Sequence, residues 1–161
     1  MTIRRVALIT GGATGVGAAV ARMLAAKNYD LLINYSRSSE AALAVVEDCI
    51  GLGADAVCAK GDVSNDTDCR ALVSQAMQRW GRIDALVSSA GTTQFIPMAD
   101  MEAVTAADFE RVYAVNTVGP FQMARAVKAH MQPGSAIVNV SSIASLTGSG
   151  RAPVRRCRRR C

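Results

Sequence analysis

A cluster of glycines near the N-terminus has the composition and spacing of a phosphate-binding turn. An apolar run from Val6 to Ile9 leads into Thr10, Gly11, Gly12, Thr14, Gly15, Val16 and Gly17, and an alanine-rich segment with helical spacing follows. Glycine lacks a Cβ, so it can adopt positive φ and let the backbone approach a phosphate closely. Strand, glycine turn and helix in this order bind the pyrophosphate of a dinucleotide, because the helix N-terminus offers free N–H groups. The alternative is a glycine-rich loop that binds nothing.

Arg37 bears on the choice of cofactor. A site for NAD places an acidic side chain at the end of the second strand, where it bonds the adenosine ribose hydroxyls. Here that strand ends in Asn34 and Tyr35, which carry no negative charge, and Arg37 follows at once. A guanidinium suits the 2′-phosphate of NADP through charge-assisted hydrogen bonds. We therefore expect NADP, with NAD less favoured; the alternative is that Arg37 is a solvated loop residue.

A parallel sheet is needed to position these residues. Short runs rich in Val, Ile and Leu predict five strands buried on both faces: Val6–Thr10, Leu31–Tyr35, Ala56–Lys60, Ala85–Ser89 and Ala136–Val140. Helical spacing predicts helices near 15–27, 40–51, 66–80 and 106–130. Alternating strands and helices imply right-handed crossovers, so the predicted fold class is α/β, a Rossmann-type doubly wound parallel sheet.

Two of these helices have recognisable ends. Ser38 or Ser39 can cap the second helix, and Gly51 and Gly53 can end it. In the fourth, a threonine and an aspartate three residues apart, at 105 and 108, form a capping-box pattern. The sequence therefore predicts where these two helices begin.

The composition describes one globular domain and a basic tail. The chain has 161 residues, half of them apolar, and a net charge of +5. Residues 151–161 contain six arginines and no acid, which leaves 12 basic and 13 acidic residues in the first 150. We therefore expect no nucleic-acid partner for the body. No apolar run reaches membrane-spanning length and no signal peptide is visible, so we expect a soluble cytoplasmic protein.

Histidine and cysteine offer little metal or redox chemistry. The only histidine, His130, lies at a predicted helix end, where a cation is ordinarily favourable. Three cysteines fall in predicted helices and strands, where a free thiol behaves as a small apolar residue: Cys49, Cys58 and Cys69. Cys157 and Cys161 form an isolated C-x-x-x-C, which is weak as a zinc site. We expect reduced thiols and no metal.

Five motifs in order resemble those of the short-chain dehydrogenase/reductase family, over roughly residues 3–150. They are T-G-x-x-x-G-x-G at 10–17, G-D-V at 61–63, D-A-L-V-S-S-A-G at 84–91, V-Y-A-V-N-T-V-G-P-F at 112–121 and I-V-N-V-S-S at 137–142. The family usually has D-x-L-V-N-N-A-G in the third motif, so Ser88 and Ser89 replace two asparagines that brace the sheet. Among family members, the chain is most similar in these motifs to 3-oxoacyl-carrier-protein reductases.

The resemblance implies cofactor contacts from the second and third motifs. Asp62 would bond the amino group of adenine, and Val63 would pack on the ring. The segment of Ser89, Ala90 and Gly91 would approach the nicotinamide ribose. An alternative for Asp62 is a turn residue that caps the helix starting near residue 65.

The fourth and fifth motifs carry the catalytic residues that the resemblance implies. Asn116 would sit at an irregularity of its helix, which Gly119 and Pro120 favour, and hold a water of the proton relay. The alternative is an asparagine that faces solvent. Ser142, the second serine of its pair, would bond and orient the substrate oxygen at the carboxyl end of its strand.

The family's Y-x-x-x-K pair is not found in this sequence. Its tyrosine, the acid/base, typically follows the serine by about thirteen residues, and positions 155 and 159 are both arginine here. A phenol with a lowered pKa can transfer a proton, whereas a guanidinium, whose pKa exceeds about 12, keeps its own. We expect a partial NAD(P)-binding Rossmann domain over 1–150, truncated after about the fifth strand. Residues 151–161 would be an arginine-rich tail outside the family, as a lost coding frame would produce.

The function expected from this resemblance is NADP(H)-dependent hydride transfer to or from a carbonyl or a secondary alcohol. The substrate would be a small molecule, with an acyl thioester as one candidate, and the parent family is homo-oligomeric. Because the proton donor is missing, we expect this chain to be catalytically impaired. The alternatives are a non-catalytic NAD(P)-binding remnant and, less favoured, a nucleic-acid binder that acts through its basic tail.

Overall fold

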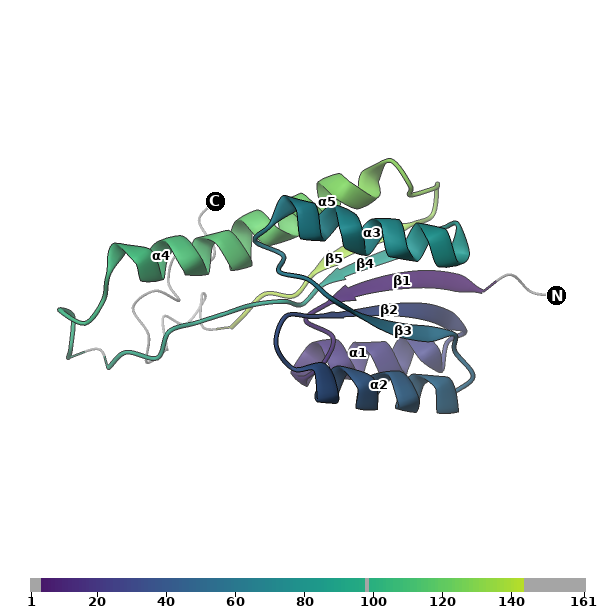
Figure 1. Cartoon of the computed structure of the whole chain (residues 1–161), viewed down its shortest axis with the longest axis horizontal. Helices are drawn as coiled ribbons and strands as arrows, with labels where there is room; N and C mark the ends of the chain where they lie inside the picture. The colour runs from purple at the N-terminus through teal and green to yellow at the C-terminus, as the bar shows by residue number, and fades with distance from the viewer. Residues whose placement is uncertain (1–3, 98, 144–161) are drawn as a thin grey trace.

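The chain folds around a five-stranded, wholly parallel sheet in the computed structural model, which describes residues 4–97 and 99–143 (Figure 1). The strand order is β3-β2-β1-β4-β5. The strands are β1 (Arg5–Thr10), β2 (Tyr29–Tyr35), β3 (Ala56–Lys60), β4 (Ala85–Ser88) and β5 (Ala136–Asn139). The helices are α1 (Gly15–Ala25), α2 (Ser39–Gly51), α3 (Asp66–Trp80), α4 (Ala106–Tyr113), the π-helix η1 (Ala114–Val118) and α5 (Gly119–Lys128). The α/β fold predicted from the sequence is confirmed, and most predicted boundaries lie within two residues of those observed.

Helices cover both faces of the sheet, with α1 and α2 on one side and α3 and α5 on the other (Figure 1). Alternate residues of each strand point to opposite faces, so each face has its own apolar core. Ile9, Ile33 and Val87 pack with α1 and α2. Leu8, Leu32 and Leu86 pack with α3 and α5. This layering leaves the carboxyl ends of the strands as the place where loops from both sides meet.

The predicted helix at 106–130 is three consecutive pieces, α4, η1 and α5. A π-helix carries an extra residue per turn and is frequent at functional sites. It ends directly before Gly119 and Pro120, and proline cannot donate a helix hydrogen bond. The irregularity predicted around Asn116 is therefore present, as the π-helix η1. In Figure 1 the α4 segment extends past the carboxyl ends of the strands, away from the N-terminus.

The helix ends follow the sequence with one exception. Thr105 and Asp108 form a full capping box, in which each side chain accepts from the other's backbone N–H. Ser38 occupies the N-cap position of α2, but its side chain makes no capping hydrogen bond. Helix α2 ends at Gly51, and Gly53 adopts positive φ just beyond it.

The prediction that every strand is buried on both faces is wrong for β5. All four of its residues are exposed, including Ile137 and Val138. The strand lies at the edge of the described sheet and pairs with β4 alone, and the described helices pack mainly on β1 to β4. An apolar run therefore predicted the strand correctly but not its surroundings.

Candidate functional site

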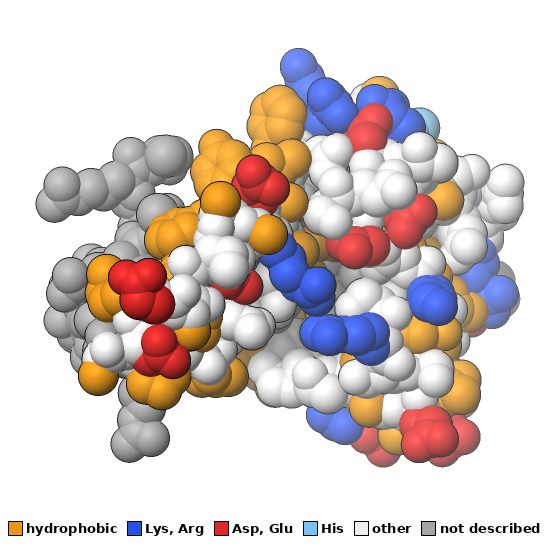
Figure 2. All heavy atoms as spheres, turned by 60° about the vertical axis from the view of Figure 1, so that its left-hand side comes forward, with side chains coloured by type: hydrophobic (Ala, Val, Ile, Leu, Met, Phe, Trp, Pro, Cys, Tyr) orange, Lys and Arg blue, Asp and Glu red, His pale blue; other side chains and the backbone are white. Residues whose placement is uncertain are grey.

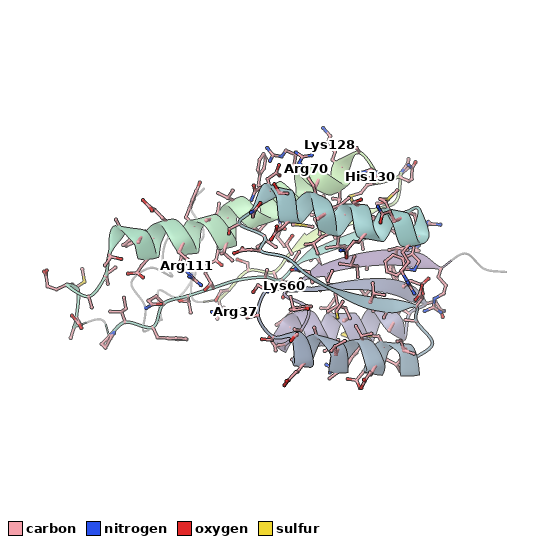
Figure 3. All side chains as sticks on the ribbon, viewed as in Figure 1. Arg37, Lys60, Arg70, Arg111, Lys128 and His130 are labelled. Atoms are coloured by element: carbon pink, nitrogen blue, oxygen red, sulfur yellow. The ribbon has the colours of Figure 1, made fainter. Side chains whose placement is uncertain are left out.

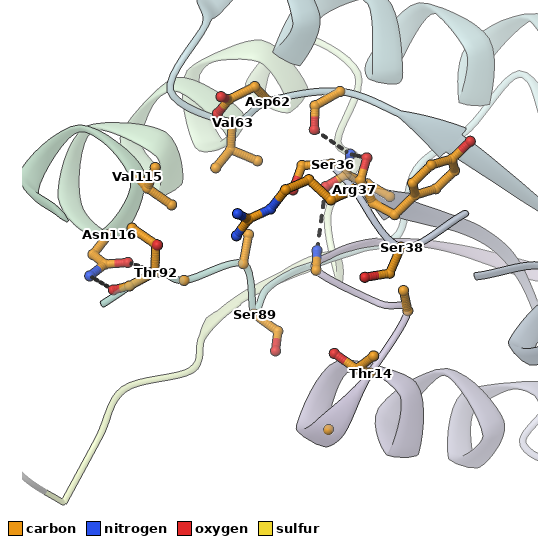
Figure 4. Close-up of a pocket in the computed structure, with 18 of the residues that line it drawn as sticks. Thr14, Ser36, Arg37, Ser38, Asp62, Val63, Ser89, Thr92, Val115 and Asn116 are labelled. Carbon is orange, nitrogen blue, oxygen red and sulfur yellow. Dashed lines mark hydrogen bonds between the residues drawn. The ribbon is translucent and has the colours of Figure 1, made fainter. Parts of the chain in front are cut away.

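A cavity of about 870 Å³ lies at the carboxyl ends of the strands. Its walls come from the loops after β1, β2, β3 and β4, from α4 and η1, and from the end of β5 (Figure 4). Open parallel sheets place ligands in this crevice, where the strand order reverses beside β1. Such a cavity is large enough for a cofactor of dinucleotide size.

The structure brings together twelve of the fifteen residues predicted for the site. The residues that line the cavity are Gly11, Thr14, Gly15, Val16, Arg37, Asp62, Val63, Ser89, Ala90, Gly91, Asn116 and Ser142. The other three, Thr10, Gly12 and Gly17, lie behind this wall. Thr10 Oγ1 accepts hydrogen bonds from the backbone N–H groups of Ser89 and Ala90, at 3.2 Å each. These three residues shape the cavity without lining it.

The glycine turn is as close-packed as a dinucleotide turn requires. Gly11 has a φ of +61°, and a Cβ there would lie 2.7 Å from Ala90 Cα. A Cβ on Gly17 would overlap the carbonyl oxygen of Gly11. Gly15 has a φ of +54° and open space beside it. The sequence pattern therefore reflects tight approaches at Gly11 and Gly17 and left-handed backbone at Gly11 and Gly15.

The N-terminus of α1 opens onto the same turn. Its N-cap residue, Thr14, makes no side-chain capping bond, and the first turn contains no acidic residue. The amide groups of this turn and the helix dipole therefore favour an anion in the cavity. A dinucleotide pyrophosphate fits this end of the cavity in charge and in the room that the glycines leave.

Asn34 is a structural residue of the site that the sequence reasoning missed. It is buried, and its Nδ2 donates to the carbonyl oxygens of Ala59 and Gly61, at 3.3 and 2.9 Å. Its Oδ1 accepts from the N–H of Gly11 at 3.3 Å. One amide thus joins the loops after β1 and β3. The sequence signal for this role was a polar residue next to the end of an otherwise apolar strand.

Three basic side chains surround the cavity, and two were missed by the sequence reasoning. Arg37, Lys60 and Arg111 all line it, and they lie together at the carboxyl ends of the strands in Figure 3. Figure 2 shows Lys and Arg side chains gathered about a hollow in the middle of this face. Among the described arginines, only Arg37 and Arg111 have no hydrogen bond or ion pair assigned to them. Both arginines that lack such a partner therefore face one cavity.

Arg37 reaches into the cavity from the loop between β2 and α2 (Figure 4). Ser36 and Ser38 line the same end, and Lys60 enters it from the neighbouring strand, where it is in register with Tyr35. Two hydroxyls and two cations are the groups that bind a phosphate monoester. Arg37 is exposed and lines the cavity, so its role as a phosphate ligand stays a prediction beside the solvated-loop alternative.

Asp62 is both a turn residue and a lining residue. Its Oδ1 accepts from the N–H and the hydroxyl of Ser64, at 2.9 and 2.7 Å, and its own N–H donates to Asp68 Oδ2 at 2.8 Å. Helix α3 is capped by Asn65, which accepts from the N–H of Thr67. The alternative in which Asp62 caps that helix is wrong, because Asn65 has this role.

Asn116 lies in the π-helix η1 and binds the loop after β4. Its Oδ1 accepts from the N–H of Thr92 and its Nδ2 donates to the carbonyl of Thr92, each at 2.8 Å (Figure 4). The solvent-facing alternative is wrong, since the side chain is partly buried and doubly bonded. The geometry fixes the position of this loop against the helix.

The segment directly after β5 completes the cavity. Val140 and Ser142 line it, and Ser142 is half-buried. The replacement of Asn by Ser at position 88 has a visible consequence nearby, since the buried Ser88 Oγ has no hydrogen-bond partner among the described residues. Positions 155 and 159, like the rest of the predicted tail, lie outside the described residues, so the division at residue 150 stays a prediction.

The cysteines and the histidine lie away from this chemistry. Cys49 and Cys69 are buried, Cys58 is partly buried, and all three are free thiols. Burial raises the pKa of Cys69 to about 11, so its thiol stays protonated. His130 follows α5, on the side of the molecule away from Arg37 in Figure 3. Over residues 4–97 and 99–143, no group of three metal-ligating side chains is found. No helix in this part of the chain is long and apolar enough to cross a membrane.

Comparisons with known proteins agree with this geometry. Residues 5–154 match the sequence profile of the short chain dehydrogenase family. An uncharacterised oxidoreductase of Methylorubrum extorquens is 37% identical over 139 residues, which cover 86% of this chain and 55% of the relative. A Streptomyces violaceoruber protein named as a ketoacyl reductase of the granaticin polyketide synthase is 37% identical over 147 residues, covering 90% and 57%. The chain spans just over half the length of these curated relatives.

Solved structures share the fold closely. A Burkholderia xenovorans protein described as a short-chain dehydrogenase/reductase superposes with a TM-score of 0.88 at 37% identity, covering 96% of this chain and 66% of the other. A short chain dehydrogenase from Burkholderia cenocepacia, solved in complex with NADP, gives 0.86 at 29% identity, covering 93% and 60%. The chain belongs to the short-chain dehydrogenase/reductase family.

Proposed function

We propose that the cavity binds NADP(H) in the arrangement for hydride transfer between the nicotinamide ring and a carbonyl or secondary alcohol of a small molecule, and that turnover by this chain is impaired. One observation carries this proposal: the glycine turn, Arg37, Asn116 and Ser142, which come from four separate stretches of sequence, line a single cavity. The family relationship and the relative solved with NADP support it. When bound, the dinucleotide supplies or accepts the hydride.

The residues of this chain would bind and orient the reactants. Ser142 offers a hydroxyl that can donate a hydrogen bond to the substrate oxygen, and so hold the reacting carbon beside the nicotinamide site. Asn116 holds the Thr92 backbone, and with it the loop after β4 that lines the cavity. The substrate-binding and cofactor-binding parts of the cavity are thereby fixed relative to one another.

We propose that the cavity binds NADP in preference to NAD, because of the residues that line one end of it. Arg37, Lys60, Ser36 and Ser38 line it together, and no acidic side chain follows β2 in the place where NAD sites carry one. The 2′-phosphate of NADP would meet two cations and two hydroxyls there. An NAD ribose would meet no acceptor of comparable strength for its hydroxyls from the loop after β2.

The substrate and assembly parts of the proposal rest on likeness. A relative named as a ketoacyl reductase supports a 3-oxoacyl thioester as the substrate class. Homo-oligomerisation and a cytoplasmic location stay predictions from the sequence.

Turnover by this chain would be impaired. Reduction of a ketone needs a proton for the nascent alkoxide, and general acid catalysis is worth about 10²–10⁴-fold. At the positions where the family has its tyrosine and lysine this sequence has Arg155 and Arg159. The site would then act as a dinucleotide-binding remnant, and the sequence at these two positions favours this second function.

Two measurements on one folded sample test the proposal. Calorimetric titration should show NADPH binding, and oxidation of NADPH with a small β-keto ester should remain near background. Failure of a folded sample to bind NADPH or NADH would overturn the proposed site. Enzyme-dependent oxidation that is abolished by Ser142→Ala would show that another residue donates the proton and that the impairment is wrong.

A further inference from the structure

Gln122 is a polar residue in the apolar inner face of α5. Its neighbours on this face, Met123, Ala126 and Val127, belong to the core under α3 and α5. Gln122 is itself only 8% exposed. A buried amide without a partner is costly, so the bond that such a side chain makes shows what its position requires.

The partner of Gln122 is the backbone of the loop after β3. Its Nε2 donates to the carbonyl oxygen of Val63 at 3.0 Å, in a buried bond. The thiol of Cys69 on α3 donates to the same oxygen at 3.3 Å. Helices α3 and α5 therefore hold one peptide group of this loop between them.

The side chain of Val63 is held as tightly as its carbonyl. A Cβ on Gly119 would lie 2.8 Å from Val63 Cγ2, so α5 approaches this side chain as closely as a glycine allows. Val63 is 4% exposed, and what remains of its surface lines the cavity. In Figure 4 Val63 and Val115 border the same part of the cavity, from the β3–α3 loop and from η1.

We propose that Gln122 is a positioning residue for the adenosine half of the dinucleotide. It touches no cofactor atom; it fixes Val63, which forms the apolar wall against which the base would lie. The inference rests on the proposed dinucleotide site. Because η1 and α5 are consecutive, the same stretch of helix holds the base wall through Gln122 and the Thr92 loop through Asn116.

This role differs from that of the basic residues in a measurable way. Gln122 is bonded to the loop after β3, whereas Arg37 lies in the loop after β2. Gln122→Met keeps the length of the side chain but cannot donate. We expect it to weaken NADPH and NADH equally, by up to about five- to tenfold, since the full contribution of a buried hydrogen bond is the upper limit of what a displaced Val63 costs in binding. The ratio of the two affinities should stay that of the wild type.

Fragments of the cofactor locate the effect. Gln122→Met should weaken ADP by the same factor as NADPH and leave reduced nicotinamide mononucleotide unchanged. Gln78→Met is the matched control, because Gln78 is exposed on α3 and bonds only Ser74 there. We expect the control to bind every probe as the wild type does.

A second variant gives a readout that a purely structural role would not produce. In Gln122→Glu, a protonated carboxyl can donate to the Val63 carbonyl, whereas a carboxylate cannot. Burial raises the pKa of such a carboxyl. The affinity of this variant for ADP should therefore rise as the pH is lowered, relative to the wild type, while that of Gln122→Met should show no such rise.

The outcomes separate this inference from the proposed function. If the folded wild type binds no dinucleotide, both are overturned. If the wild type binds a dinucleotide and both Gln122 variants bind ADP as tightly as the wild type does, only the role of Gln122 is overturned. A change in the NADPH to NADH ratio would also overturn it, since it would assign Gln122 to the 2′-phosphate end.

Discussion

The pairing of arginines differs between the two ends of the parallel strands. We call the end at which the strands begin the amino edge and the end at which they finish the carboxyl edge. At the amino edge, arginines pair with aspartates: Arg4 with Asp30 at 2.7 Å, Arg79 with Asp55 at 2.5 Å and Arg82 with Asp84 at 2.6 Å. At the carboxyl edge, Arg37 and Arg111 face the cavity, and neither has an ion pair assigned to it within the described residues; outside the cavity, Asp66 at the start of α3 pairs with Arg70 and Arg125. The arginines of the amino edge join strands and helices, whereas the cavity at the carboxyl edge leaves its two arginines available to a ligand.

Side chains bind backbone groups at both edges, and one helix end at the carboxyl edge is left without such a bond. At the amino edge Asp84 accepts from the N–H of Val6, and Asp30 accepts from the N–H of Asp55, so side chains bind the strand ends together. At the carboxyl edge Thr10, Asn34 and Asn116 bind the backbone of the loops, but the first turn of α1, which faces the cavity, receives no side-chain cap. The comparison predicts that substitutions at the amino edge change stability, whereas substitutions at the carboxyl edge change binding.

The largest effect is expected from Gly11→Ala. The new Cβ would lie 2.7 Å from Ala90 Cα at a position with positive φ, which forces the turn and the β4 loop apart. NADPH affinity should fall by about 100-fold or more, since both displaced segments line the cavity. Gly51→Ala is the control, because a Cβ there has no neighbour within 4 Å. Wild-type affinity in Gly11→Ala, measured by calorimetry, would refute the assignment of this turn.

The next effect belongs to the amino edge. Asp84→Asn removes the charge that accepts from Arg82 and Val6, and should lower the free energy of unfolding by about 1–2 kcal/mol. The affinity for NADPH should not change. Asp48→Asn is the control, since the Arg22–Asp48 pair is exposed and should contribute about 0–1 kcal/mol. A loss of NADPH affinity in folded Asp84→Asn would break the division between the edges.

The pH dependence of stability sharpens this prediction. Burial would raise the pKa of Asp84, but hydrogen bonds from Arg82 and from the N–H of Val6 outweigh it and hold the pKa below its usual value. A lowered folded-state pKa contributes stability above the unfolded pKa, about 3.9, which is lost as the pH falls through the folded value. The stability difference between wild type and Asp84→Asn should therefore shrink below about pH 4, as measured by denaturant unfolding at several pH values.

The smallest effects separate the basic residues of the carboxyl edge. Arg37→Gln should weaken NADPH by about tenfold and leave NADH nearly unchanged, because a charge-assisted bond to phosphate is lost. Lys60→Gln should act in the same direction by about two- to threefold, since an ammonium binds phosphate as a single point charge. Lys27→Gln, which lies outside the cavity lining, is the control. If Arg37→Gln lost the same affinity for NADPH as for NADH, the 2′-phosphate would not bind at this end of the cavity.

Periodicity was sufficient for the fold because the strands and helices alternate with clear turn residues between them. All five strands follow from it, and the capping box at Thr105 follows from the residue types at positions 105 and 108. The exposure of β5 does not, because an apolar run does not show which elements cover a strand. The sequence therefore predicts the topology correctly but gives the wrong burial for β5.

The candidate site was predictable where a motif fixes a local shape, as in the glycine turn. It was not predictable where contacts cross the fold. Asn34 joins loops more than twenty residues apart, and Gln122 reaches a carbonyl 59 positions away. Lys60 enters the cavity only because β3 is in register with β2. Such residues need the topology before their role becomes visible.

The most direct test of the account is a calorimetric titration of the folded chain with NADPH and with NADH. We predict that both bind, NADPH more tightly, and that the preference for NADPH falls by about tenfold in Arg37→Gln while the fold, followed by circular dichroism, stays intact. A folded chain that binds neither dinucleotide would contradict the assignment of the cavity at the carboxyl edge.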